Sequence, residues 1–362
     1  MIGRTLFNYY AALFAKWILG LFLGATLLAL LIDFLEVARS NLGKEEASTL
    51  TVFAISALRV PLITEQLLPF AVLVGSIGAF LSLSRRSELV VSRAAGISVW
   101  QFSAPGFIVA LVIGIFATGV YNPLATAMKA ESDRISTSLG SAASLLTDTT
   151  SGAWLRQQTA EGEAVMRVQG IADNGRLVLD PVFWVFGADG LLKERVEAVL
   201  GEIEGDRWVL SEARIVDVSG APRLAERYQL PTSLTPEQVR NRLSSPEIVS
   251  FWHLPETISQ AAASGLPPYR FRLQFHVLLA RPLLLASMVL IAATVSLGLS
   301  RSGGVGRMIL GGVSAGFVLY VVTEIARDLG SEGLVPAALA AWAPAVFATL
   351  MGSTVLLFRE DG

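Results

Sequence analysis

Charged side chains lie inside long apolar segments of the sequence, among them Glu65, Arg281 and Glu324. If these segments cross a membrane, the charges are costly, and such groups tend to face a bundle interior or a water-filled cavity. Two interpretations stay open. Either Glu65 and Arg281 form a structural ion pair, or all three side chains line a polar vestibule that opens to the outside.

The stretch at 84–98, SRRSELVVSRAAGIS, combines both signs of charge with a short amphipathic pattern. Ser87 is suited to cap a helix that begins at Glu88, whose carboxylate favours a helix N-terminus, and Gly96 is suited to end that helix. The flanking basic residues are Arg85, Arg86 and Arg93. The stretch is either an ordinary positively charged turn or a helix that docks a cytoplasmic partner and carries force from it.

Charges also gather at the end of the first apolar segment, at Asp33, Glu36, Arg39 and Lys44. A solvated helix end accounts for this cluster. Alternatively, Arg39 and Lys44 bind anionic headgroups or phosphates at the membrane surface. Arg134, just beyond the third apolar segment, is a weaker example of the same pattern.

The residue types that most catalytic and metal centres need are scarce. The chain has no cysteine, and its two histidines, His253 and His276, are too far apart to form a local ligand pair. The motifs GxxxxGK[ST] and HExxH are absent, and no Ser/His/Asp set occurs at a credible spacing. We therefore expect no catalytic residue, no metal site and no cofactor.

The composition indicates an integral membrane protein. Of the 362 residues, 53% are hydrophobic and 16% are charged, and the mean hydropathy is +0.58. A soluble domain usually carries about 25% charged residues. The formal net charge of −2 offers no bulk basicity to attract nucleic acid.

Six apolar runs are long enough, or nearly so, to cross a membrane as helices, which takes about 20 residues. The first is too long for the core of a signal peptide, and we interpret it as a retained span. Three runs precede a polar middle segment and three follow it, a 3+3 arrangement. The runs cover residues 11–33, 60–83, 99–120, 275–299, 308–326 and 336–357.

The basic residues of the short loops predict the orientation. If the spans alternate in direction, those residues all fall on one side, which is then cytoplasmic. Both termini lie on that side, and the middle segment lies outside. These residues are Arg4, Arg85, Arg86, Arg93, Arg301, Arg307 and Arg359.

The middle segment, about 122–270, carries more acidic than basic residues and has a different pattern. Apolar and polar residues alternate over short runs, and the turn pairs Asn174-Gly175, Asp189-Gly190 and Gly205-Asp206 separate them. This pattern is typical of antiparallel strands and hairpins, in a sandwich or jelly roll. Residues 232–266 are expected to form a polar helix, a loop and a short helix that returns to the membrane.

Several sequence elements resemble the LptF/LptG permease family, the paired transmembrane subunits of lipopolysaccharide exporters. The most specific is RSELVVSRAAGIS at 86–98, followed by LLPFAVLVGSIGAFLSLS at 67–84 and GVSAGFVLYVV at 312–322. RSELVV and DFLE at 33–36 are most similar to the LptG branch. The resemblance covers essentially the whole chain.

The resemblance implies an α-helical membrane protein with six transmembrane helices, three before and three after an inserted periplasmic all-β jellyroll-like domain. The expected division is 1–121, 122–270 and 271–362, with the cytoplasmic coupling helix at about 86–98. The first and fifth spans, about 11–35 and 308–328, then form lateral gates.

The resemblance also implies roles for single residues. Glu88 matches the acidic residue that docks in the ATPase, and the expected coupling set is Arg86, Ser87, Glu88, Leu89 and Arg93. Arg39 matches the basic residues that approach lipid A phosphates, whereas Asp33 and Ser40 stand where some relatives carry Lys. The expected lipid-binding set is Arg39, Lys44, Arg134, Glu65, Arg281 and Glu324.

The implied function is that of a permease subunit of an ABC transporter in the inner membrane, which extracts lipopolysaccharide and passes it to a periplasmic bridge. The implied partners are an LptF-like sister permease, a cytoplasmic LptB-like ATPase dimer and an LptC-like single-span protein. ATP hydrolysis then belongs to a separate subunit, and the chain itself is not an enzyme. The alternative is a mechanotransmitting or scaffold protein whose β-domain binds periplasmic partners without moving lipid.

Overall fold

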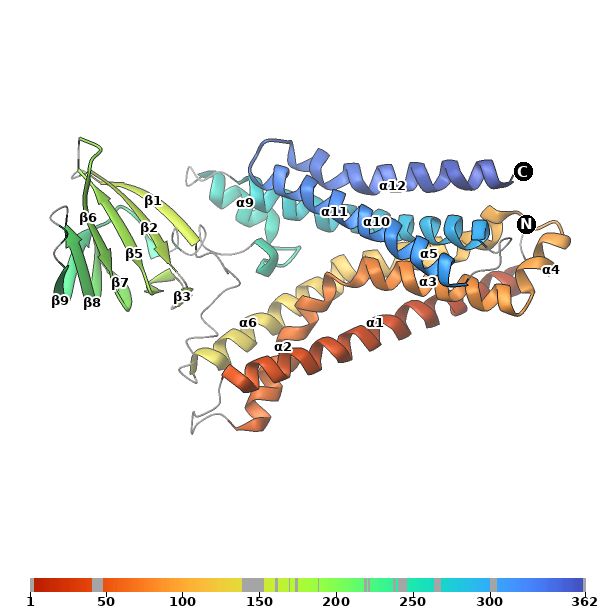
Figure 1. Ribbon diagram of the computed structural model, residues 1–362, viewed down its shortest axis with the longest axis horizontal. Helices are drawn as coiled ribbons and strands as arrows, with labels where there is room; N and C mark the ends of the chain where they lie inside the picture. The colour runs from red at the N-terminus through yellow and green to blue at the C-terminus, as the bar shows by residue number, and fades with distance from the viewer. Residues whose placement is uncertain are drawn as a thin grey trace.

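The structure is a computed structural model that shows two groups of helices separated in sequence by a β-sheet (Figure 1). It describes residues 3–40, 48–138, 153–159, 162–168, 170–172, 175–187, 189–217, 220, 222–236, 239, 246–263, 268–299 and 305–360.

Six helices are long and apolar enough to cross a membrane, three before the sheet and three after it, so the predicted 3+3 arrangement around a β insert is confirmed. These segments are Arg4–Arg39, Leu68–Arg85, Val99–Ser136, Tyr269–Ser296, Leu310–Ser331 and Ala337–Phe358. The helices before the sheet are α1 (Arg4–Ser40), α2 (Thr49–Glu65), α3 (Leu68–Arg85), α4 (Glu88–Ala94), α5 (Val99–Phe116), the π-helical turn η1 (Ala117–Tyr121) and α6 (Asn122–Ser138). The helices after it are the 3₁₀ turn η3 (Pro246–Ile248), α9 (Leu254–Ala263), α10 (Tyr269–Leu299), α11 (Val305–Ser331) and α12 (Ala337–Glu360).

The run at 60–83, which we expected to be one span, is broken between α2 and α3 at Gln66 and Leu67. Pro69 lies in the first turn of α3, the place in a helix where a missing N–H and a fixed φ are best tolerated. Pro69 also has no N–H to donate to the Glu65 carbonyl four residues earlier, and its ring crowds that carbonyl, so the first helix ends at Glu65 and a new one starts here. The span is therefore α3, and α2 is a separate helix that begins with a Ser48 side-chain cap.

The third span is also longer than expected. Helical structure does not stop at 120 but passes through the π-helical turn η1 and continues as α6 to Ser138. The polar composition of α6 explains why hydropathy alone places the end too early: the path stays helical after the apolar run has ended.

Small residues let the helices before the sheet approach closely. A Cβ added at Gly75 of α3 would lie 2.7 Å from the Ile18 backbone of α1, and one at Gly106 of α5 would lie 2.8 Å from the Phe14 ring. Such close backbone contact is typical of helix packing in membranes. Phe14 and Ile18 are fully buried in the core that these helices share with α10.

The middle segment forms one antiparallel sheet of nine strands among the described residues. The strand order is β1-β2-β5-β6-β8-β7-β4-β3, and β9 pairs with β8. The long strand β8 pairs with β6 and β7 through different parts of one edge and with β9 through the other. The strands are β1 (Ala153–Thr159), β2 (Gly162–Val168), β3 (Gly170–Ala172), β4 (Leu177–Leu179), β5 (Val182–Phe186), β6 (Leu192–Glu197), β7 (Leu200–Glu204), β8 (Arg207–Asp217) and β9 (Pro222–Pro231).

The predicted turns position these strands. Gly205 and Asp206 connect β7 to β8 in a two-residue turn, and Gly205 takes the left-handed φ of +66° that favours glycine. Gly190, with φ +76°, lies in the turn between β5 and β6. In the remaining predicted turn, Asn174-Gly175, Asn174 lies outside the described residues. The sheet encloses an apolar core of its own, in which Phe183 and Trp208 are fully buried.

The chain returns to the helices through η3 and α9. The expected helix that leads back to the membrane is α9, which packs on α10 through Leu254, Ile258 and Phe271. Most of the polar helix expected before it falls on residues that the structure does not describe.

The two ends of the helix bundle differ (Figure 1). We call the end where α6 leads to the sheet and α10 begins the β-side end. The opposite end, which carries both chain termini and α4, is called the terminal end.

Candidate functional site

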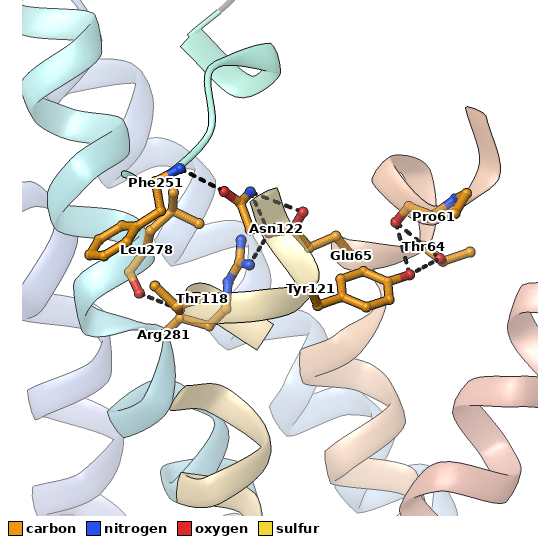
Figure 2. A network of polar contacts seen from close by, with 9 residues as sticks. All are labelled: Pro61, Thr64, Glu65, Thr118, Tyr121, Asn122, Phe251, Leu278 and Arg281. Atoms are coloured by element: carbon orange, nitrogen blue, oxygen red, sulfur yellow. Dashed lines mark hydrogen bonds and ion pairs between the residues drawn. The ribbon is translucent and has the colours of Figure 1, made fainter. Parts of the chain in front are cut away.

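At the β-side end, a buried polar network joins helices that are far apart in sequence (Figure 2). Glu65, the last residue of α2, forms an ion pair with Arg281 of α10. Asn122, at the start of α6, donates from Nδ2 to both carboxylate oxygens of Glu65, at 3.0 and 3.1 Å. Sequence alone offered Glu65 and Arg281 as possible partners, and the structure places them together.

Asn122 also reaches the segment that returns from the sheet. Its Oδ1 accepts the backbone N–H of Phe251 at 3.0 Å, and its side chain is only 1% exposed. Since both ends of the amide are occupied, Asn122 connects the Glu65–Arg281 pair to the polypeptide just before α9. A buried amide with both groups bonded fixes a single geometry, because either unmade bond would cost free energy.

The π-helical turn contributes two further polar side chains, Thr118 and Tyr121. Thr118 Oγ1 donates to the Leu278 carbonyl of α10 at 2.8 Å. The Tyr121 hydroxyl lies 3.0 Å from the Pro61 carbonyl of α2 and 3.0 Å from Thr64 Oγ1. The network therefore involves α2, η1, α6, α10 and the return segment.

Glu324 does not join this network. It lies on α11 beside Arg327, 3.4 Å away and one turn along the same helix, and both side chains are partly exposed. Arg281 and Arg327 both line a cavity of about 30 Å³ between α10, α11 and α12, which is large enough for one or two water molecules.

At the terminal end, α4 forms the predicted short helix between two spans. Leu89 is buried against the bundle, whereas Val90, Val91 and Arg93 are exposed. Gly96, with φ +78°, ends the helix as predicted. The prediction that Ser87 caps the helix with its side chain is wrong. Only two residues separate the ends of α3 and α4, so Ser87 takes a left-handed φ of 59° to reverse the chain and makes no capping bond.

Two tyrosines of α1 hold α4 in place. The Tyr9 hydroxyl donates to Glu88 Oε1 at 3.1 Å, and the Tyr10 hydroxyl lies 2.7 Å from Ser92 Oγ in a buried contact. Arg86 lies 4.0 Å from the Glu88 carboxylate. Glu88 is thus partly exposed and tied to the first helix at the same time.

The other predicted lipid-binding residues lie apart from the network. Arg39 is exposed in the last turn of α1, and Arg134 is exposed on α6 with Glu131 2.8 Å away. Lys44 lies outside the described residues. Asp33 is buried, and its carboxylate lies 3.6 Å from Arg59 of α2.

Sequence reasoning missed Asn122, Arg59, Tyr9 and Tyr10. The available signal for Asn122 was weak: an Asn-Pro pair directly after an apolar run is more often the sign of a turn. Nothing in the one-dimensional pattern indicates that Tyr9 and Tyr10 meet residues about 80 positions later.

The polar side chains of the site hold the helices in position relative to one another. Among the residues that the structure describes, no three His, Cys, Asp or Glu side chains are grouped so that they could hold a metal ion. At the β-side end, Glu65 instead binds Arg281, and Asp33 lies beside Arg59, each across two helices.

These features define a multi-pass membrane protein with an inserted antiparallel β-domain, a polar network at one end of its helix bundle and a short surface helix at the other. Residues 8–358 match the model of the family described as lipopolysaccharide export system permease LptF/LptG. The chain belongs to this family, whose members are permease subunits and not catalytic enzymes.

Curated relatives agree with that assignment. The chain is 26% identical over 344 residues to the lipopolysaccharide export system permease protein LptG of Haemophilus influenzae, across 92% of this chain and 93% of that protein. It is 25% identical over 312 residues to the protein of the same name from Escherichia coli K12, across 84% of each.

Proposed function

We propose that this chain is the LptG-type permease subunit of an ABC transporter that extracts lipopolysaccharide from the inner membrane and passes it to a periplasmic bridge toward the outer membrane. One observation carries the proposal. The family match at 8–358 runs through both groups of three spans and the β-domain between them, so it covers the complete architecture and not one common part of it.

In this proposal the membrane parts are 1–121 and 271–362, and 122–270 is the periplasmic part, with α6 as its first element. Both termini and α4 face the cytoplasm. The basic residues at the terminal end support this orientation, since Arg4, Arg85, Arg86 and Arg93 all lie there.

A lipid with several acyl chains needs an apolar path, because exposing each CH₂ group to water costs about 0.8 kcal/mol. The apolar core of the β-sheet, with Met166, Phe183, Trp208 and Leu210 fully buried, is a region where acyl chains leaving the membrane could be accepted after opening. That role for the sheet interior is part of the proposal.

Energy must come from another subunit, since the sequence lacks the GxxxxGK[ST] motif that cradles nucleotide phosphates. We propose α4 as the docking element for an LptB-like ATPase dimer. Val90, Val91 and Arg93 offer an exposed apolar and basic surface, while buried Leu89 and the tyrosine contacts fix the helix to the bundle. Force applied to α4 would then reach α1 directly.

At the β-side end, Arg39 and Arg134 are the exposed cations that we propose to meet lipid phosphates, together with Lys44. Glu65, Arg281 and Glu324 are proposed to support lipid binding in this region without forming part of that exposed surface. The Glu65–Arg281 pair is too buried to bind a headgroup without first separating.

The decisive experiment is affinity purification of the tagged chain from native membranes in mild detergent, with identification of all eluted components. The proposal expects an LptF-like sister permease and an LptB-like ATPase in stoichiometric amounts, with an LptC-like single-span protein and lipopolysaccharide. Elution alone, or with periplasmic proteins only, would instead support a scaffold or mechanotransmitting protein.

Replacing Glu88 by Ala should weaken ATPase docking by about 10- to 150-fold, since a hydrogen bond to a charged group contributes about 1.5–3 kcal/mol. Copurification of the ATPase measures the effect. Tyr9→Phe is the matched control, because it removes the contact of Glu88 with α1 but keeps the carboxylate. An equal loss in both variants would mean that Glu88 acts only by holding α4, and no loss in either would remove Glu88 from the interface.

Reversing the charge of Arg39 should reduce lipid binding near the β-side end. The assay is crosslinking of lipopolysaccharide to a photoreactive amino acid at Leu35, which is exposed on the same helix. Arg39→Glu is expected to lower the crosslinked fraction, whereas Arg4→Glu, at the opposite end of α1, is expected to leave it unchanged. Undiminished crosslinking in Arg39→Glu would exclude Arg39 from headgroup binding.

A further inference from the structure

Three helix irregularities meet at the polar network (Figure 2). The first is the break between α2 and α3, directly after Glu65. The second is the π-helical turn Ala117–Tyr121 between α5 and α6. The third is Pro282, inside α10. Each is a recognised cause of bending, and π-helical turns are frequent at functional sites.

The π-helical turn η1 compensates for the proline inside α10. Because Pro282 has no N–H, the Leu278 carbonyl four residues earlier loses its helical partner. Thr118 of the π-helical turn donates to that carbonyl at 2.8 Å and replaces the lost bond. Gly114, one turn before η1, lies against the Pro282 backbone so closely that an added Cβ would be 2.4 Å from the Pro282 Cα.

The π-helical turn is tied in the same way to its other neighbours. Tyr121 donates to the Pro61 carbonyl of α2, and the Gly119 carbonyl accepts the Trp252 indole N–H at 3.0 Å. Asn122 adds the contacts to Glu65 and to the Phe251 N–H. At each of the three bends, backbone groups or adjacent side chains are therefore hydrogen-bonded to another helix or to the return segment.

We propose that these three bends form one hinge layer, about which the β-side arms of the bundle move together relative to its terminal end. The arms are α2, α6, and the start of α10 with α9 on it. Since backbone groups at the bends are satisfied by side chains of neighbouring segments, the helices can bend there without leaving unpaired groups in the membrane. Asn122 couples the return segment from the β-domain to this motion.

The length of α2 determines how far a given rotation at the layer displaces its far end. With 17 residues, α2 is about 25 Å long, so a rotation of about 10° at Glu65 moves its far end by about 4 Å. The helices α1 and α11 contain no proline and run past the layer unbroken. Motion should thus be confined to the arms, and contacts at the terminal end should persist.

Distances between paired spin labels test the proposal, and the absence of cysteine makes the labelling specific. The arm pair is Leu50→Cys on α2 with Leu329→Cys on α11, the helix that runs past the layer unbroken. The terminal pair is Asn8→Cys on α1 with Phe358→Cys on α12; all four positions are exposed. Measurements use the full chain with its copurifying subunits, reconstituted in lipid without nucleotide. The proposal expects a wider distance distribution for the arm pair than for the terminal pair. Equal widths would overturn it.

A matched pair of proline variants tests the hinge itself. Pro282→Ala restores an N–H to α10 and should narrow the arm-pair distribution. Pro105→Ala, in the part of α5 that lies nearer the terminal end, should leave it unchanged. Equal effects of the two variants would overturn the proposal.

Should Pro282→Ala fail to assemble, Thr118→Val provides a second test. This variant leaves the Leu278 carbonyl without its partner and should shift the mean arm-pair distance. Thr126→Val is its control, because the Thr126 hydroxyl donates only within α6, to Pro123. An unshifted distance in Thr118→Val would count against the hinge. None of these readouts depends on lipid transport, so they stand apart from the test of the proposed function.

Discussion

The ion pair between Glu65 and Arg281 allows a quantitative test of how the bundle is held together. The side chains are only 4% and 13% exposed, respectively, and Asn122 bonds to the same carboxylate. Removing one partner of a buried pair typically costs about 3–5 kcal/mol, because the other charge remains buried without compensation. Replacing both by neutral residues of similar size is often close to neutral.

We therefore expect Arg281→Met to lower the free energy of unfolding by about 3 kcal/mol, the low end of that range, since Asn122 still donates to Glu65. Glu65→Gln should cost a similar amount, because it leaves Arg281 uncompensated while the new amide oxygen still accepts from Asn122. The double variant should cost much less than the summed single costs of about 6 kcal/mol. A cost of about 3 kcal/mol or less for the double variant gives a coupling free energy of at least about 3 kcal/mol. An ordinary interhelical hydrogen bond in a membrane averages about 0.6 kcal/mol and reaches about 1.7, so the coupling distinguishes a buried charge pair from such a bond.

The assay is unfolding by SDS in mixed micelles, followed by circular dichroism, for the two single variants and the double variant. Glu324 and Arg327 supply the control pair, since they are 3.4 Å apart but 37% and 29% exposed. Their coupling should fall within about 0–1 kcal/mol. The reasoning would be refuted if the costs of the two single variants summed to the cost of the double variant within about 0.5 kcal/mol. Such additivity would mean that the two charges do not interact.

Two further predictions concern packing and pH. Gly114→Ala should destabilise the chain by about 1–3 kcal/mol in the same assay, because the new methyl group meets the Pro282 backbone at 2.4 Å, whereas Gly24→Ala, with nothing within 4 Å, should have little effect. Similar stability of both variants would disprove the close contact. In the sheet, burial and then the hydrogen bond to Glu194 raise the pKa of Tyr228 to about 12 from its ordinary 10. Since the folded state holds this proton more tightly than the unfolded state, the stabilisation is complete below pH 10 and is lost between pH 10 and 12. The melting temperature should therefore fall more steeply between pH 9 and 12 for the wild type than for Tyr228→Phe. Parallel plots of melting temperature against pH would contradict a raised pKa for Tyr228.

The membrane helices follow closely from hydropathy, but their irregularities do not. A run such as 99–120 must be buried in lipid or protein, which the composition alone requires. Where the helix bends depends on which carbonyls find partners, and the partners of Thr118 and Tyr121 lie on other helices. The break after Glu65 could have been anticipated from Pro69, whereas the π-helical turn has no comparable sign in the sequence.

In the β-domain too, some features follow from the local sequence and others depend on contacts between distant segments. The Gly205-Asp206 turn predicts a local hairpin, because a two-residue turn needs only its own backbone conformation. The placement of β8 between β9 on one side and both β6 and β7 on the other requires contacts across the whole domain. Local patterns therefore identify strands and turns but not their order in the sheet.

The sequence by itself determined that this chain is a membrane protein with two groups of three spans around a β insert, and it indicated the short charged helix at 86–98. These features depend on composition and on short-range periodicity, which each segment carries independently of the rest. Only the tertiary structure decided that Glu65 meets Arg281, that Asn122 joins them to Phe251 and that Tyr9 holds Glu88. Such contacts depend on the relative position and rotation of helices, which packing of the whole bundle fixes and no single segment encodes.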